Sequence, residues 1–192
     1  MQQLFERVSG WNAARYEREY NHKLAVKLLR EEYTEWLNKT DLTNEVKELS
    51  DITFVALGVL WKLGVTDEEN QVWADHSGKY VQHIINIADL APGYYMATIL
   101  DMMECDHISP LNACHVIAYL CQAQLLHLGI GPDLGMDCFN AICDSNDTKP
   151  VVKTASDVKA NKDKGDGYRP AEPDLLLILN KAGLTECLSL VR

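Results

Sequence analysis

The sequence lacks a long hydrophobic run. Hydrophobic residues make up 47% of the chain, but no stretch approaches the roughly 20 apolar residues that a transmembrane helix needs. Near the N-terminus, Glu6 and Arg7 interrupt the apolar residues Leu4, Phe5 and Val8, unlike the apolar core of a signal peptide. We therefore expect no membrane partner and no signal peptide. The length of 192 residues suits a single domain, 1–192.

Cysteine pairs with C-x-x-C spacing are also missing. None of the six cysteines forms such a pair, and the composition is unlike that of a disulfide scaffold. Cys114 and Cys121 are seven residues apart, on one helical face, and are most simply core residues. These features predict a reduced, cytoplasmic compartment.

Positive charge is scarce. The chain has 18 lysines and arginines against 28 acidic residues, for a formal net charge of -10. Binding to a nucleic acid needs clustered lysine and arginine, so we expect no nucleic-acid partner. A small phosphorylated ligand that is bound together with Mg²⁺ remains compatible with this charge.

Strand-like alternation of apolar and polar residues is absent, and apolar residues recur with helical spacing instead. The sequence predicts an all-α helical bundle with helices over about 11–38, 42–63, 66–89, 92–106, 110–128, 133–146 and 173–183. Asp41, Thr66 and Ser109 are the expected N-caps, and Gly64 and Gly129 are expected to end two helices. The single domain would consist of a core (11–146), a basic loop (147–172) and the C-terminal helix (173–183).

Two acidic pairs flank the turn between the first two predicted helices. Glu32 and Glu35 are three residues apart, as are Glu48 and Asp51. This spacing puts both members of a pair on one helical face, so an antiparallel hairpin can bring four carboxylates together. They repel one another unless a cation neutralises them, and Mg²⁺ prefers such oxygen ligands. The alternative is two solvated acidic faces, but the apolar stripe beside each pair favours a metal site.

Much of the positive charge in the second half of the chain lies in one segment. Residues 147–173 contain five lysines and one arginine, and no other lysine occurs between Lys79 and Lys181. Three prolines and two glycines lie in the same stretch. It is either a mobile linker to the last helix or a basic lid that meets the phosphates of a ligand at the acidic cluster. Composition favours neither interpretation.

Three segments together resemble a known family. Residues 31–35 read EEYTE and residues 48–51 read ELSD, which resembles the EExxE and ExxD motifs of MazG-like all-α nucleoside triphosphate pyrophosphohydrolases. Residues 143–149 (CDSNDTK) and 164–170 (KGDGYRP) are similar to the downstream SN-x-x-K and KG-x-x-Y-x-P segments of that family. This chain departs from the family at Asp147-Thr148, where Met-Ser is commoner, and at Ala171-Glu172, which interrupts a proline pair.

The resemblance implies an enzyme that uses Mg²⁺, or Mn²⁺, to cleave a nucleoside triphosphate into the monophosphate and pyrophosphate. Its metal ligands would be Glu32, Glu35, Glu48 and Asp51. Glu31, the fifth catalytic residue, would orient or deprotonate the attacking water, or else face solvent. The resemblance also implies that Lys149 and Lys164 contact the phosphates and that Asn146 and Tyr168 contact the nucleotide. It further implies a homodimer or homotetramer.

A non-catalytic alternative remains open. A helical binding or regulatory module could keep the acidic helices and sequester a nucleotide without turnover. The intact acidic motifs favour the enzyme, and a pyrophosphate assay separates the two. The preferred base and sugar are not indicated by the sequence.

Overall fold

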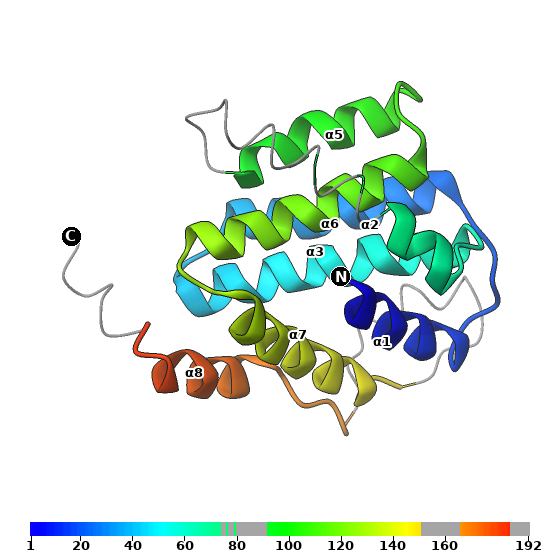
Figure 1. Ribbon diagram of the computed structural model, residues 1–192. Helices are drawn as coiled ribbons and strands as arrows, with labels where there is room; N and C mark the ends of the chain where they lie inside the picture. The colour runs from blue at the N-terminus through cyan, green and yellow to red at the C-terminus, as the bar shows by residue number, and fades with distance from the viewer. Residues whose placement is uncertain (74–75, 77–78, 80–91, 151–165, 185–192) are drawn as a thin grey trace.

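The computed structural model describes residues 1–73, 76, 79, 92–150 and 166–184. In this part of the chain every regular element is a helix, which confirms the all-α prediction. The elements are α1 (Gln2–Ala13), α2 (His22–Leu37), α3 (Leu42–Lys62), the 3-10 helix η1 (Pro92–Tyr94), α5 (Tyr95–Glu104), α6 (Pro110–His127), α7 (Pro132–Asp147) and α8 (Glu172–Lys181) (Figure 1). None of the described helices is by itself long and apolar enough to cross a membrane; α6 and α7 pass that test only as a pair bent by 118°.

Helix α3 is the centre of the fold. It packs against α6 and α2, and α1, α7 and α8 contact it from the side opposite α5 (Figure 1). The predicted core face of α3 is fully buried at Val46, Leu49, Thr53, Ala56 and Leu60 and half-buried at Leu63. Cys114 and Cys121 on α6 are also buried, as predicted. The apolar positions recur every three or four residues, so one stripe of α3 faces its neighbours along its whole length.

The predicted helix ends are confirmed where side chains mark them. Asp41, Thr66 and Ser109 each accept a hydrogen bond from the backbone N–H three residues further on. Gly64 and Gly129 follow α3 and α6 with φ of 90° and 81°, in the left-handed region that glycine adopts without strain. Local chemistry therefore sets these boundaries.

The predicted helix over 11–38 is wrong in its first part, because residues 14–21 are not helical. The side chain of Asn21 caps α2, and Arg18 donates to two carbonyl oxygens at the C-terminal end of α3. These hydrogen bonds outweigh the helical propensity of the segment, which contains alanine, arginine and glutamate. Helix α1, mostly outside the predicted helices, precedes this break.

Parts of two predicted segments lie outside the described residues. They are residues 74–75, 77–78 and 80–89 of the predicted helix 66–89, and residues 151–165 of the basic loop. The predicted phosphate contact Lys164 belongs to the second of these. The interpretations of residues 147–172 as a lid or a linker therefore both stay predictions.

The N-cap of α3 provides the first testable prediction. Oδ1 of Asp41 accepts a hydrogen bond from the N–H of Asn44 at 2.9 Å. Asp41→Ala leaves this N–H unpaired and should lower the free energy of unfolding by about 1 kcal/mol. Asp41→Asn keeps the acceptor and should retain most of the stability. Urea unfolding followed by circular dichroism measures both, and an equal loss in the two variants would contradict a capping role.

Candidate functional site

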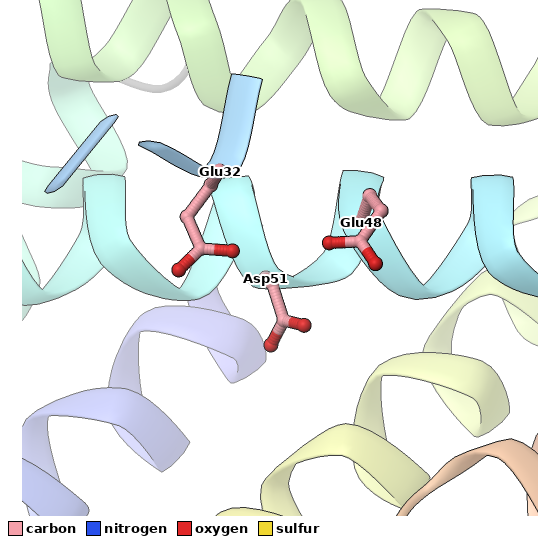
Figure 2. A group of neighbouring side chains, drawn as sticks. All are labelled: Glu32, Glu48 and Asp51. Carbon is pink, nitrogen blue, oxygen red and sulfur yellow. The ribbon is translucent and has the colours of Figure 1, made fainter. Parts of the chain in front are cut away.

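Three carboxylates lie together between α2 and α3. Glu32 comes from α2 and Glu48 and Asp51 come from α3, and one ligand oxygen from each lies within 4.8 Å of the others. Figure 2 shows the three side chains gathered along α3. Glu48 is only 3% exposed, whereas Glu32 and Asp51 are half-buried. The structure thus groups three of the four predicted metal ligands; Glu35, one turn further along α2, is exposed and outside the group. We call Glu32, Glu48 and Asp51 the acidic triad.

The local sequence explains why the acidic triad lies at the edge of the core. Each carboxylate is directly followed in the chain by a buried residue, Tyr33, Leu49 or Ile52 respectively. A helical neighbour is rotated by about 100°, so burying one residue turns the preceding one toward the margin of the packed stripe. The short turn that ends at Asp41, the N-cap of α3, joins α2 to α3. It brings the carboxylate-bearing edges of the two helices together.

A lysine already contacts the acidic triad. Nζ of Lys47 donates to Oε1 of Glu48 at 2.8 Å and to Oδ2 of Asp51 at 3.0 Å. Nδ2 of Asn44 donates to the same Oε1 of Glu48 at 3.0 Å. The other oxygen of Glu48, Oε2, is buried and receives no hydrogen bond from the described residues. One ammonium group therefore contacts two of the three carboxylates, and one buried acceptor receives no hydrogen bond from the described residues.

The pKa values reflect this excess of negative charge. Burial raises the pKa of Glu32 to about 8, and the charges of Asp51, Glu35 and Glu48 act in the same direction. Burial also raises the pKa of Glu48, against the hydrogen bond from Lys47. For Lys47, burial lowers the pKa, but the charge of Asp51 and the hydrogen bond to Glu48 raise it overall. A divalent cation would favour the ionised carboxylates over their protonated forms.

The donor set fits a Mg²⁺ ion. All three groups offer carboxylate oxygens, which Mg²⁺ prefers, and a spread of up to 4.8 Å is close to the ~4.2 Å between opposite ligands at ~2.1 Å from the ion. Oε2 of Glu48 is a buried oxygen without a donor among the described residues. Such a group is costly to bury unless a ligand satisfies it. The residues present therefore suit a hard divalent cation.

Two members of the acidic triad, Glu32 and Asp51, line a cavity of about 920 Å³. Of the predicted site residues, those that line it are Glu31, Glu32, Glu35, Asp51, Asn146, Lys149 and Tyr168. They come from α2, α3, the C-terminal end of α7 and the segment before α8. Glu48 is not among the lining residues, and Lys164 lies outside the described residues. The fold thus brings the acidic motif and the downstream segments to one cavity, although more than 90 residues separate them in the chain.

Hydrogen bonds at the end of α7 position the second wall of the cavity. Oγ of Ser145 donates to the carbonyl oxygen of Arg169 at 2.7 Å, and the N–H of Arg169 donates to Oγ1 of Thr148 at 2.9 Å. Both bonds fix the chain next to Tyr168, which lines the cavity. Asn146 is buried, and Lys149 is half-buried just beyond the helix end. Because Ser145 and Thr148 hold Arg169, the two downstream segments lie side by side.

The cavity is also lined by residues that were not predicted to belong to the site, most of them aromatic or aliphatic. They are Trp11, Asn12, Tyr16, Tyr20, Leu24, Leu28, Phe54, Val55 and Val59. The contribution of α1 could have been found from the spacing of Leu4, Phe5, Val8 and Asn12, all of which are buried.

Lys47 also lines the cavity. Its signal in the sequence is a lysine directly before Glu48 and four residues before Asp51.

The cavity is therefore lined both by charged and amide side chains and by aromatic and aliphatic ones. Such a combination suits a ligand that carries both anionic and flat apolar groups. Comparisons of this chain with protein families, with curated protein sequences and with solved structures find no match.

Proposed function

We propose that this protein is a Mg²⁺-dependent nucleoside triphosphate pyrophosphohydrolase. The observation that carries the proposal is the shared cavity: carboxylates that fit a divalent cation line it together with Lys149, Asn146 and Tyr168. The resemblance of the same residues to MazG-like motifs supports the proposal independently of the geometry. On this proposal the helices form a bundle of the MazG-like type, in a homodimer or homotetramer.

The charges in the cavity favour a triphosphate that arrives with its cation. A triphosphate alone would be repelled by Glu31, Glu32, Glu35 and Asp51, all of which line the cavity. When bound, Mg²⁺ neutralises part of this charge and makes a water molecule easier to deprotonate. Lys149 lines the same cavity as Glu32 and Asp51 and can donate to oxygens of the β- or γ-phosphate. Lys149 and a cation held by the triad would both bind the triphosphate.

The remaining roles follow from position. Glu31 directly precedes Glu32, lines the cavity and can accept the proton of a water that attacks the α-phosphorus. A bond then forms between the water oxygen and phosphorus, the bond to the α,β-bridging oxygen breaks, and pyrophosphate leaves with that oxygen. Glu35 lines the cavity without joining the triad, so its carboxylate would add to the negative charge that attracts a cation. Asn146 and Tyr168 would contact the nucleoside portion.

The direct test is an assay of product. The protein is incubated with Mg²⁺ and a panel of ribo- and deoxynucleoside triphosphates, and pyrophosphate and monophosphate are measured. We expect both products in equal amounts for at least one nucleotide and their loss in excess chelator. Tight nucleotide binding with neither product would favour the alternative, a helical module that sequesters a nucleotide. Full turnover in chelator would contradict the metal site.

Lys149 should distinguish triphosphates from monophosphates. Lys149→Ala removes a charge-assisted hydrogen bond and should weaken binding of a non-hydrolysable triphosphate by about 1–3 kcal/mol, with a smaller effect on the monophosphate. Lys181→Ala on the exposed surface of α8 is the matched control. Calorimetric titration in the presence of Mg²⁺ gives the dissociation constants. Equal triphosphate binding by Lys149→Ala and Lys181→Ala would show that Lys149 does not contact the triphosphate.

A further inference from the structure

Lys47 is the positively charged residue that contacts two carboxylates of the acidic triad. Its ammonium group lies 2.8 Å from an oxygen of Glu48 and 3.0 Å from an oxygen of Asp51. The side chain is only 16% exposed, so these contacts are not those of a freely solvated surface pair. Two of the three triad members therefore already have a positive partner when no metal is present.

We propose that Lys47 is an exchangeable internal counter-ion, which stabilises the acidic triad without metal and is displaced when a divalent cation binds. This inference rests on the proposed function, since it concerns the same site. Lys47 would set how tightly the site binds its cation. Lys47 is thus a positioning residue rather than a metal ligand, because an ammonium group cannot coordinate a cation.

The geometry makes simultaneous binding unfavourable. A cation shared by Glu48 and Asp51 would lie close to the oxygens that Lys47 now contacts, and two positive centres a few ångströms apart repel each other strongly in a partly buried site. The ammonium group must leave its present contacts for the cation to take them. Lys47 lines the cavity and has a long flexible side chain, so it can turn away without any movement of α3.

The unsatisfied oxygen of Glu48 shows that Lys47 is an incomplete substitute. Both described donors to this carboxylate, from Lys47 and Asn44, reach Oε1. Oε2 stays buried without a donor from the described residues. A permanent structural partner would be expected to satisfy the buried carboxylate fully. The remaining acceptor is instead available to a second positive group.

Substitution of Lys47 separates an exchangeable counter-ion from a structural ion pair. Lys47→Met keeps most of the side-chain volume and removes the charge. We expect it to lower the thermal midpoint in chelator, because the triad loses its partner, and to tighten binding of Mn²⁺ or Mg²⁺ alone by on the order of tenfold, because the competitor is gone. A purely structural lysine would lower stability without tightening cation binding.

Lys27→Met is the matched control. Lys27 also lines the cavity, but it is largely exposed and pairs with Glu31 at 3.7 Å rather than with the triad. This substitution removes the same charge from the same cavity, so it measures the general electrostatic effect. We expect a much smaller change in cation affinity than for Lys47→Met.

Lys47→Arg gives a second readout if Lys47→Met fails to fold. Arginine keeps the charge and can hold carboxylates with two parallel hydrogen bonds, so it should resist displacement and weaken cation binding. Calorimetry with the metal salt alone, without nucleotide, measures all four proteins. If wild type binds a cation but Lys47→Met binds it no more tightly and Lys47→Arg no more weakly, the counter-ion inference is wrong while the proposed function stands. If no protein binds a cation without nucleotide, the counter-ion inference is also wrong, whereas the proposed function fails only if the product assay with Mg²⁺ and nucleotide yields no pyrophosphate.

Discussion

Asp51→Asn should lower the turnover of nucleoside triphosphate by about 100-fold or more. Asp51 is one of the three carboxylates of the acidic triad and lines the cavity beside Glu32. Substitution of groups that only support a metal ligand already lowers metal affinity or activity by about 10- to 100-fold. Loss of a ligand charge should therefore reduce activity at least as much. Steady-state release of pyrophosphate at saturating Mg²⁺ is the measurement.

Stability measurements on Asp51→Asn show whether a loss of activity comes from the lost carboxylate or from unfolding. Asparagine has nearly the shape of aspartate, and removal of one negative charge relieves repulsion within the triad, although the ion pair with Lys47 at 3.0 Å is also lost. We therefore expect the helical circular dichroism signal and the thermal midpoint in chelator to change little. Asp137→Asn, an exposed aspartate of α7 outside the cavity lining, should retain full activity. Normal turnover by Asp51→Asn would refute the metal site.

Trp36→Ala should lower the free energy of unfolding by about 3–5 kcal/mol, the range for a fully buried large aromatic residue. Trp36 is 1% exposed and lies one turn beyond Glu32 on α2. Its Nε1 donates to Glu45 on α3 at 3.2 Å. A Cβ atom added at Gly93 would lie only 2.5 Å from the ring, so the chain passes directly over it. The truncation leaves a large cavity between α2, α3 and η1 that these backbones cannot fill by small shifts.

Trp73→Ala is the control of the same residue type. Trp73 is 36% exposed and stacks on His115 with ring centroids 6.2 Å apart, so its removal should destabilise the fold much less. Urea unfolding at fixed pH gives both free energies. Similar losses in the two variants would show that Trp36 is not the packing centre of the α2–α3 hairpin. At temperatures where Trp36→Ala remains folded, its cation binding should be weaker than in wild type, because Glu32 and Trp36 share α2.

Features that depend on near neighbours in the chain can be predicted from the sequence. The side chains of Asp41 and Ser109 compete locally for the first N–H groups of a helix, so these boundaries are readable from a few residues. Helical periodicity likewise identified the core stripe of α3. The spacing of Glu48 and Asp51 places them on one helical face wherever that helix packs. These inferences need no knowledge of the tertiary structure.

Which residues from distant segments come into contact depends on how the helices pack. The exposed Glu35 lies outside the triad although its spacing from Glu32 matches that of Glu48 and Asp51, because the rotation of α2 against α3 sets which carboxylates face inward. The break before α2 depends on hydrogen bonds from Arg18 to the end of α3, a contact across more than 40 residues. The shared cavity of Asp51 and Lys149 arises in the same way. Packing and distant hydrogen bonds act between segments that local sequence does not relate, which is why periodicity and spacing alone could not predict them.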